Sequence, residues 1–565
     1  MMLIDYSPKS KRFVIECTFA ENSQIARLPE KRFMRRTRKW HAPALARNAE
    51  YLLEHCRASM TPAAVEVAEK ALQRILIRRV PFPAWYDFKT EPYQNQQQAL
   101  DHVWGLDRFA LFMEMGTGKT KTAIDYHSAR MMTGQTDCWV ILCPNAVRDV
   151  WAKNEIPLHC PLGLPTEIVG DLTDAKSRRL VEWARSQDRF AVVVGLESLQ
   201  QKVRDGKAYN TLAEMLAGRK YGMTIDESHK VKNPDAIRSK NAESLADTAQ
   251  CINIQTGTPT TRCVLDLYQQ FKIMDPNIIG VSDYYAFRSN YAEMGGFENR
   301  EVVGYKNLEE LMGLIKPYTF QCRKEDAVDL PPKVYTMRKT RLSKEQAKLY
   351  KQVKQEGAAM IRDMKDQPIA VIVEQVLQQY NALQQIVGGF LNYDQDDGVR
   401  ASSWIVDPAK NAKIQEVQAV LEENPGSRVI VWAKYRNEIA QVVEALDSVD
   451  SVVEYHGGLS SAERAESIRR FKDGEARVFV ANQQTGSEGL TLNEANLVVY
   501  FSNSLQYAQR VQSEDRNHRI GQSQSVTYVD LVAEGTVDES ILEAMRFKQD
   551  VADYVRSQID NGHEV

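Results

Sequence analysis

The chain has 565 residues, which is too many for a single hydrophobic core, so two or three domains are expected. Hydrophobic residues make up 43% and charged residues 26% of the chain, values that are ordinary for a globular protein and exclude a low-complexity one. The formal net charge is −3, so a nucleic-acid-binding function would require positive charge gathered in one region.

The sequence gives no sign of secretion or of a membrane span. Its first residues, MMLIDYSPKSKR, lack an apolar core and a cleavage-site pattern. No apolar run approaches the ~18 residues of a membrane-spanning helix. The eight cysteines contain no C-x-x-C pair, which favours reduced, buried thiols. We therefore expect a cytoplasmic or nucleoid-associated protein without a membrane partner.

Residues 1–50 form a compositionally separate basic segment. They contain eleven Lys and Arg against five Asp and Glu, a balance of +6 in a chain whose total is negative. Within them, FVIECTF alternates as a strand does. The segment PFPAWYDF, residues 81–88, has two prolines and no helical period, which indicates a linker. We therefore predict a small basic N-terminal domain over residues 1–85.

Two stretches of the chain alternate short apolar runs with longer amphipathic segments. The first spans about residues 90–260, with the runs FALFM, CWVILC, FAVVVG, YGMTI and INIQT. A mainly helical stretch follows, and the rhythm returns with RVIVWA, SVVEYH, ARVFVA, LVVYF and VTYVDLV. This rhythm is typical of parallel sheets covered by helices. We predict an α/β fold with two parallel-sheet lobes, residues 86–330 and 331–550, that carry helical insertions, followed by a tail, residues 551–565.

The segment FALFMEMGTGKT, residues 109–120, runs from an apolar strand through a glycine-rich turn into a helix. Glycines let backbone amides approach phosphate oxygens, and the helix N-terminus adds its dipole. Lys119 would reach the β- and γ-phosphates, and Thr120 would ligate Mg²⁺. The strict P-loop pattern has glycine where this chain has Met113. The predicted nucleotide-binding residues of this turn are Gly116, Thr117, Gly118, Lys119 and Thr120.

Two further motifs follow apolar runs of the first lobe. In TIDESHK, residues 224–230, Asp226 suits the Mg²⁺ shell and Glu227 suits orientation and deprotonation of the attacking water. Carboxylates at this position lie where α/β sheets bind ligands. In IQTGTPTTR, residues 254–262, Thr256 and Thr258 would bridge the carboxylate pair and the second lobe.

The second lobe contains QTGSEGLTL, residues 484–492, and QSEDRNHRIGQ, residues 512–522. Arg516 and Arg519 are one helical turn apart, so they share a face if this segment is helical. Two guanidiniums on one face can stabilise a transferring phosphoryl group as arginine fingers. Taken alone, the segment also fits a solvated basic helix.

The order of these motifs resembles that of the superfamily 2 helicases, and among them the SWI/SNF-type ATPases. The resemblance covers about residues 90–545, and HRIGQ is its most specific element. The remaining segments that carry it are YQNQQ (93–97), LCPNAVRDVW (142–151), VGLES (194–198), KEDAVDLPPK (324–333), VIVWAKY (429–435) and YHGGLSSAER (455–464).

The resemblance implies two RecA-like lobes and an ATP-dependent DNA translocase that uses ATP and Mg²⁺. It implies an adenine-reading role for Gln94, a nucleotide contact for Gly489, and catalytic roles for Lys119, Asp226, Glu227, Arg516 and Arg519. It also implies contacts to the DNA backbone from Pro144, Ser198, Thr485 and Ser487. The implied partner is duplex DNA, with forked or branched DNA as a further possibility.

The segment IARLPEKRFMRRTRKWHAPALARNAEYL resembles the substrate-recognition domain that precedes the motor in annealing helicases. Phe33 and Trp40, set among Arg and Lys, are part of this resemblance, and with Phe13 they suggest base stacking. An ordinary basic α+β appendage is the alternative. For the whole chain, two alternatives remain: a strand-separating or branch-migrating helicase, and a non-catalytic nucleic-acid-binding protein.

Overall fold

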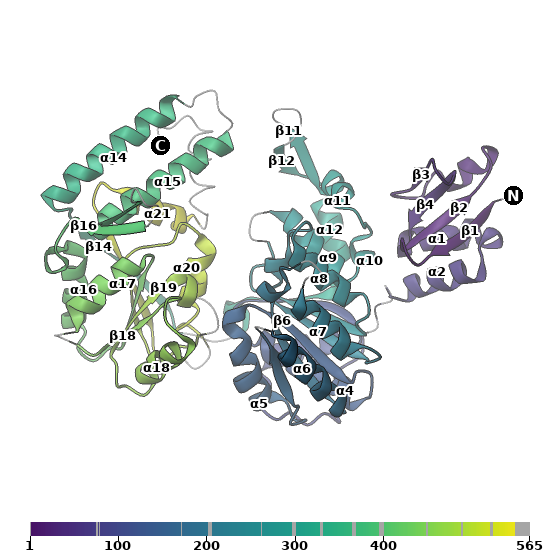
Figure 1. Ribbon diagram of the computed structural model, residues 1–565, viewed down its shortest axis with the longest axis horizontal. Helices are drawn as coiled ribbons and strands as arrows, with labels where there is room; N and C mark the ends of the chain where they lie inside the picture. Colours follow the sequence, from purple (N-terminus) through teal and green to yellow (C-terminus); the bar gives the residue numbers. More distant parts are fainter. Residues whose placement is uncertain are drawn as a thin grey trace. The chain divides into compact units, whose positions relative to one another are not determined.

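The computed structural model describes residues 2–74, 77, 79–170, 172–201, 206–260, 263–295, 301–327, 331–363, 369–394, 400–447, 450–486, 490–519, 522 and 524–547. The chain divides into two compact units, Met1–Ala327 and Val328–Val565 (Figure 1). The expected tail, residues 551–565, lies outside the described residues. No helix in the described ranges has both the length and the apolar composition of a membrane-spanning segment.

The first unit begins with a small α+β domain. Its antiparallel sheet has the strand order β1-β2-β4-β3 and is packed by two helices. These elements are β1 (Leu3–Ser7), β2 (Arg12–Glu16), β3 (Arg32–Met34), β4 (Lys39–Pro43), α1 (Ala46–His55) and α2 (Pro62–Arg74). Alternation along β2 places Phe13 and Ile15 in the core, both fully buried. The prediction that Phe13 stacks on bases is therefore wrong.

Several polar contacts join this domain to the rest of the first unit, and three of them meet Ser282 and Asp283. The backbone amide and the hydroxyl of Ser282 donate to the two carboxylate oxygens of Glu30, at 2.9 and 2.8 Å. Arg32 lies 3.2 Å from the carboxylate of Asp283. These contacts seat one edge of the small domain on the segment that precedes α11 (Tyr284–Tyr291).

Lobe one is built on a seven-stranded sheet of order β13-β5-β10-β9-β6-β8-β7, in which every neighbouring pair is parallel. Strands β6 and β8 are buried at every position, as expected when helices cover both faces. The strands are β5 (Arg108–Met113), β6 (Cys138–Cys143), β7 (Thr166–Val169), β8 (Phe190–Gly195), β9 (Tyr221–Asp226), β10 (Cys251–Gln255) and β13 (Thr319–Cys322).

The helices of lobe one alternate with these strands. They are α3 (Gln94–Val103), α4 (Lys119–Met132), α5 (Ile156–His159), α6 (Asp174–Ser186), α7 (Lys207–Leu216), α8 (Ile237–Ala246), α9 (Leu267–Met274), α10 (Pro276–Ile279), α11, α12 (Leu308–Ile315) and α13 (Lys324–Ala327). A hairpin, β11 (Ala292–Gly295) with β12 (Glu301–Tyr305), projects after α11 (Figure 1). One turn, Val150–Glu155, is a π-helix.

Lobe two has a six-stranded parallel sheet of order β14-β21-β20-β17-β19-β18. Its strands are β14 (Lys333–Thr340), β17 (Val429–Ala433), β18 (Val452–Tyr455), β19 (Val478–Asn482), β20 (Leu497–Tyr500) and β21 (Val526–Ala533). The two parallel sheets confirm the predicted α/β fold with two RecA-like lobes.

The helices of lobe two are α14 (Lys344–Asp363), α15 (Ile369–Gly388), α16 (Ala412–Glu423), α17 (Arg436–Leu446), α18 (Ser461–Lys472), α19 (Gln483–Gly486), α20 (Tyr507–Glu514) and α21 (Val537–Arg546). The long helices α14 and α15 lie side by side and form the helical insertion (Figure 1). A short hairpin follows them, β15 (Phe390–Asp394) with β16 (Arg400–Trp404).

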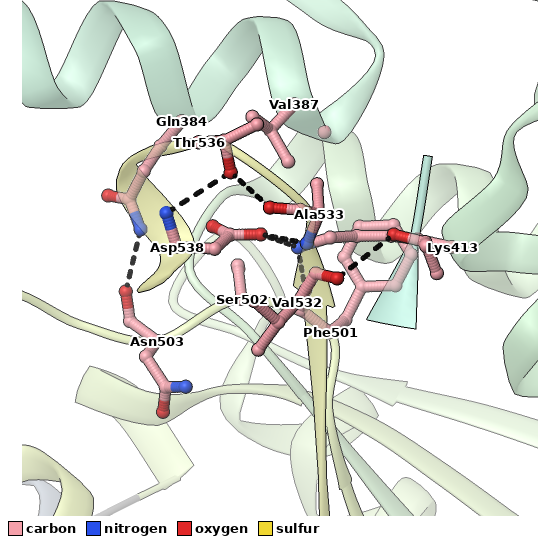
Figure 2. A network of polar contacts seen from close by, with 12 residues as sticks. Gln384, Val387, Lys413, Phe501, Ser502, Asn503, Val532, Ala533, Thr536 and Asp538 are labelled. Atoms are coloured by element: carbon pink, nitrogen blue, oxygen red, sulfur yellow. Dashed lines mark hydrogen bonds and ion pairs between the residues drawn. The ribbon is translucent and has the colours of Figure 1, made fainter. Parts of the chain in front are cut away.

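A buried ion pair fastens the helices of lobe two to its sheet (Figure 2). Lys413, at the start of α16, lies 2.6 Å from the carboxylate of Asp538, at the start of α21, and both side chains are almost fully buried. The same ammonium donates to the carbonyl of Phe501, just after β20, at 2.8 Å. Nearby, the amide of Gln384 on α15 donates to the carbonyl of Asn503 at 3.0 Å.

Candidate active site

The glycine-rich turn of lobe one lies between β5 and α4. Gly118 has φ 92°, a left-handed conformation that favours glycine, and a Cβ there would lie 1.8 Å from the Nε2 atom of Gln96. The buried Lys119 spans the turn, because its ammonium donates to the carbonyls of Met113 and Glu114 at 2.8 and 3.3 Å. Position 113, where the strict pattern has glycine, thus ends β5 and supplies one of these carbonyls. Thr120 follows, half-buried, in the first turn of α4.

Helix α3 packs against the same turn through residues that the sequence analysis did not select. The amide of Asn95 donates to the carbonyl of Thr117 at 2.7 Å. Gln96, buried to 3% exposure, lies against Gly118. Gln94, the predicted adenine reader, is exposed at the start of α3. The adenine contact of Gln94 remains a prediction, while Asn95 and Gln96 are the residues that shape the turn.

The two carboxylates stand at the end of β9, two strands from the turn. Asp226 is the last residue of the strand, and its carboxylate accepts from the amide of Gln255 at 3.1 Å and from the backbone of Glu227 at 3.0 Å. Glu227 has φ 50°, in the left-handed region that non-glycine residues rarely occupy. Such backbone strain is commonly found at functional sites.

Glu227 is held by neighbours on its other side. Its Oε2 atom accepts from the hydroxyl of Thr256 at 3.1 Å and lies 3.3 Å from Nδ1 of His229. Thr256 therefore contacts the carboxylate pair, as its place in the sequence predicted. His229 was not selected, although it stands two residues after Glu227. Gly257, the residue after Thr256, lies against the backbone of Met113 and Met115. The loop that carries Thr256 therefore also adjoins the glycine-rich turn.

The environment shifts the pKa values of the two carboxyl groups in opposite directions. Burial, and then the charge of Glu227, raise the pKa of Asp226. Burial also acts to raise the pKa of Glu227, but His229, Lys119 and Thr256 outweigh it and lower that pKa to about 2. Glu227, the residue predicted to act as base, is therefore the more readily ionised of the two. A divalent cation beside Asp226 would favour its ionised form as well.

The π-helix Val150–Glu155 carries a further hydrogen-bond donor to Asp226. The fully buried indole of Trp151 donates from Nε1 to Oδ2 of Asp226 at 2.9 Å. Single π-turns inside helices are frequent at functional sites. Both oxygens of Asp226 are therefore fixed by protein donors, and the contact joins the segment after β6 to the carboxylate site.

The predicted DNA-backbone residues of lobe one lie at the same edge of the sheet. Pro144 directly follows β6, and Ser198 lies in the turn that follows the neighbouring strand β8. The two turns are joined, because the carboxylate of Glu197 accepts from the backbone of Asn145 at 3.0 Å. Ser198 is partly exposed, whereas Pro144 is buried. The structure thus places two surface turns side by side, next to the carboxylate strand.

In lobe two, Arg516 and Arg519 lie just beyond α20, which ends at Glu514. The shared face was predicted on the condition that this segment is helical, and the structure does not meet that condition, because α20 ends before Asp515. Both guanidiniums nevertheless contact the same stretch. Arg516 donates to the carbonyl of Leu490 at 3.2 Å, and Arg519 donates to the hydroxyl of Thr491 at 2.6 Å. Arg516 is buried and Arg519 is partly exposed.

Of the other residues predicted in lobe two, Thr485 lies in the short helix α19, and its backbone amide donates to Oδ1 of Asn482 at 3.3 Å. Ser487 and Gly489 lie outside the described residues.

The residues of lobe one suit a magnesium nucleotide. A glycine-rich turn with Lys119 provides amide and ammonium donors for phosphate oxygens, and Thr120 with Asp226 provides the oxygen ligands that Mg²⁺ prefers. Lobe one is therefore a P-loop nucleotide-binding fold.

Comparison with known families assigns the chain more closely. It matches the SNF2-related domain over residues 96–388, which is 293 of its 565 residues, and the helicase conserved C-terminal domain over residues 412–521. The chain belongs to the SNF2-related family.

Two curated relatives illustrate its position in the family. The chain is 26% identical to the DNA annealing helicase and endonuclease ZRANB3 of Homo sapiens, over 75% of this chain and 36% of that protein. It is 26% identical to the TATA-binding protein-associated factor mot1 of Aspergillus fumigatus, over 84% of this chain and 27% of that protein. The chain spans about a third of the length of the curated relatives it matches.

Among solved structures, the Sulfolobus solfataricus SWI2/SNF2 ATPase core in complex with dsDNA aligns with 21% identity and a TM-score of 0.38, over 85% of this chain and 96% of that one.

Proposed function

We propose that the chain is a DNA-dependent ATPase of SWI/SNF type that couples ATP hydrolysis to movement along DNA. The observation that carries this proposal is the shared edge of the lobe-one sheet. Lys119 lies beyond β5, Asp226 and Glu227 lie at the end of β9, and the paired turns of Pro144 and Ser198 follow the adjacent strands β6 and β8. One rigid sheet thus carries a nucleotide site and a surface for DNA backbone contacts.

Each residue has a distinct task in this mechanism. Bound ATP and Mg²⁺ would supply the phosphoanhydride bond and part of its charge neutralisation. Lys119 and the turn amides bind the phosphates, and Thr120 and Asp226 hold the metal. Glu227 takes the proton of the attacking water, because Thr256 and His229 orient its side chain through the Oε2 atom. We propose that Arg516 and Arg519 complete the site when the lobes close.

The small N-terminal domain suggests a finer proposal, recognition of forked or branched DNA. Its β3–β4 hairpin exposes Phe33 at 47%, with the ring of Trp40 at 5.2 Å between centroids. The basic residues of the hairpin and its turn are Arg32, Arg35, Arg36, Arg38 and Lys39. Stacking surfaces amid positive charge suit unpaired bases beside converging backbones. The relative named as a DNA annealing helicase supports this proposal.

The decisive experiment measures phosphate release by the full chain without DNA and with single-stranded, duplex, forked and four-way junction DNA. We expect duplex and forked DNA to stimulate the rate. Equal rates with and without every DNA would contradict the motor. ATP binding without any phosphate release would favour the non-catalytic alternative. Strand separation on the fork, measured in parallel, would favour the helicase or branch-migration alternative.

A further inference from the structure

A polar track crosses one face of the lobe-one sheet and ends at the carboxylate site. Strand β10 is buried at every position, so apolar side chains are expected along it, yet it carries Asn253 and Gln255, both at 0% exposure. The parallel register pairs Asn253 with Thr224 and Gln255 with Asp226 on β9. Because alternate residues of a strand share a face, these four side chains, the polar track, lie on one side of the two strands. Burying such groups is costly unless each finds a hydrogen-bond partner.

The partners of Asn253 and Gln255 form a chain of hydrogen bonds that ends on Asp226. The Nε2 atom of Gln255 donates to Oδ1 of Asp226 at 3.1 Å, and its Oε1 atom accepts from Nδ2 of Asn253 at a longer 3.4 Å. The Oδ1 atom of Asn253 lies 2.8 Å from Nε2 of His127, which is fully buried on α4. Helix α4 begins with Lys119, so the chain joins the helix of the glycine-rich turn to the carboxylate site.

The far end of this chain fixes its direction. The indole Nε1 of Trp139 can only donate, and it donates to the hydroxyl of Thr224 at 2.9 Å. That hydroxyl in turn donates to Oδ1 of Asn253 at 2.5 Å, which leaves the Nδ2 atom of Asn253 for Gln255. Gln255 therefore accepts with Oε1 and presents its NH₂ group to Asp226. A donor at this position suits the ionised carboxylate, which is the form that binds a metal.

His127 takes a single tautomer in this arrangement. Burial lowers the pKa of His127 to about 3, so its ring is neutral. Since Oδ1 of Asn253 is an acceptor, Nε2 of His127 carries the ring proton. Its Nδ1 atom lies 3.8 Å from Sγ of Cys251, and burial raises the pKa of that thiol to about 11, so the thiol is the donor. Every hydrogen bond from Cys251 to Asp226 therefore runs toward the carboxylate, and bonds in such a row strengthen one another.

We propose that Gln255 is a positioning residue for Asp226, the predicted ligand of Mg²⁺. Its amide holds Oδ1, as the indole of Trp151 holds Oδ2, and each oxygen keeps a lone pair for the metal or its water. Asn253, itself held by His127, prevents the amide from turning over, because a reversed amide would set oxygen against the carboxylate and NH₂ against NH₂. This inference rests on the proposed function, since it takes ATP and Mg²⁺ as the ligands of lobe one.

The test measures the affinity of the full chain for a fluorescent, non-hydrolysable ATP analogue at equilibrium, once with Mg²⁺ and once with a chelator. The ratio of the two dissociation constants reports the metal-dependent part of binding without any turnover. Gln255→Met keeps the length of the side chain but removes both ends of its amide. It should weaken binding about tenfold with Mg²⁺, the lower end of the effect of removing a group that orients a metal ligand. Binding with the chelator should stay as in the wild type, because the glycine-rich turn and Lys119 are untouched.

Asn253→Leu is the second variant. It keeps Gln255 but removes the hydrogen bond that holds its Oε1 atom, so the amide can turn and present oxygen to Asp226. It should show a smaller loss of affinity than Gln255→Met, again confined to the measurement with Mg²⁺. If Gln255→Met does not fold, Asn253→Leu decides the question on the same two constants.

Gln269→Met is the matched control, since Gln269 on α9 is also fully buried and donates to a carboxylate outside the site, that of Glu243, at 2.9 Å. It should lower the melting temperature as Gln255→Met does, but leave both dissociation constants unchanged. If Gln255→Met and Asn253→Leu weaken binding equally with Mg²⁺ and with the chelator, or change only the melting temperature, the polar track is structural and the positioning role is overturned. A wild-type chain that binds no analogue, or binds it equally with and without Mg²⁺, would instead overturn the proposed function.

Discussion

The site carboxylates of lobe one and the buried charges of lobe two differ in their partners. Asp226 is held by Trp151, Gln255 and a backbone amide, all of them neutral donors. In lobe two, Arg510 is almost fully buried and pairs with both Asp530 and Glu514, and Glu514 also meets Lys333. These four charges of lobe two cancel within the protein.

This difference separates structural charges from charges kept for a ligand. Cancelled pairs such as Lys413 with Asp538, or Lys121 with Asp125 on α4, need nothing from outside the fold. Asp226 is held by neutral donors, so a divalent cation that binds beside it would favour and neutralise its ionised form. Removing a charge of the first kind should destabilise the fold, whereas removing one of the second kind should change ligand binding or catalysis.

The largest effect on catalysis is expected from Glu227→Gln. The substitution keeps the shape of the side chain but removes the group that accepts a proton from water. Phosphate release should fall by ~10²–10⁴ while ATP remains bound, and the melting temperature should hardly change. Glu214→Gln, at an exposed position of α7, is the control and should have wild-type rates. If ATP affinity collapses while turnover per bound ATP persists, Glu227 has another role.

The largest effect on stability is expected from Arg510→Met. The change leaves the buried carboxylate of Asp530 without its cation and leaves Glu514 with Lys333 alone, which should lower the free energy of unfolding of lobe two by about 3–5 kcal/mol. Hydrogen exchange of β20 and β21 in the full chain measures this loss locally.

Arg469→Met provides the contrast to Arg510→Met. Arg469 meets Glu466, Asp473 and Glu475, but its side chain is 46% exposed. Its removal should lower stability far less than Arg510→Met does, because solvent screens an exposed ion pair. Equal losses of stability in the two variants would contradict the distinction between buried, paired charges and solvated charges.

A smaller effect is expected from Trp151→Phe, which keeps the aromatic ring but removes the donor to Asp226. Loss of a group that orients a metal ligand typically lowers metal affinity or activity by about 10–100-fold. The Mg²⁺ concentration that gives half-maximal ATPase activity should therefore rise. Trp183→Phe, on α6 against Phe190, is the control and should leave that concentration unchanged. A fall in thermal stability with an unaltered Mg²⁺ requirement would reduce Trp151 to a packing role.

The sequence was sufficient for those parts of the site that are local in the chain. Lys119 follows β5 after one glycine-rich turn, and Asp226 and Glu227 lie at the end of β9, so strand rhythm and motif place them at one sheet edge. Trp151 could not be predicted, because it reaches Asp226 across 75 residues through a π-turn that has no sequence signature.

The end of α20 shows a second limit of sequence analysis. The spacing of Arg516 and Arg519 fits a helix, but their guanidiniums bond to Leu490 and Thr491 on a distant segment. Tertiary contacts of this kind override local helical preference. In the small domain, the +6 balance predicted a basic surface. The burial of Phe13 could not be predicted in the same way, because it depends on the pairing of β2 between β1 and β4.

The smallest effects are expected in the turn of the β3–β4 hairpin, where Arg35 and Arg36 are exposed and would contribute mainly through DNA. Arg35→Gln with Arg36→Gln should make the salt slope of fork binding shallower by about 1.8, two contacts of about 0.9 each. Phe33→Ala should leave that slope intact but weaken fork binding by about 1 kcal/mol, because it removes only a stacking surface. Plain duplex binding should change less in both variants.

Lys9→Gln with Arg27→Gln removes two exposed charges elsewhere in the domain and serves as control. If the domain only packs on lobe one, through Glu30 and Ser282, the hairpin variants will bind fork and duplex as the wild type does. Glu30→Gln would then lower stability and all activities together.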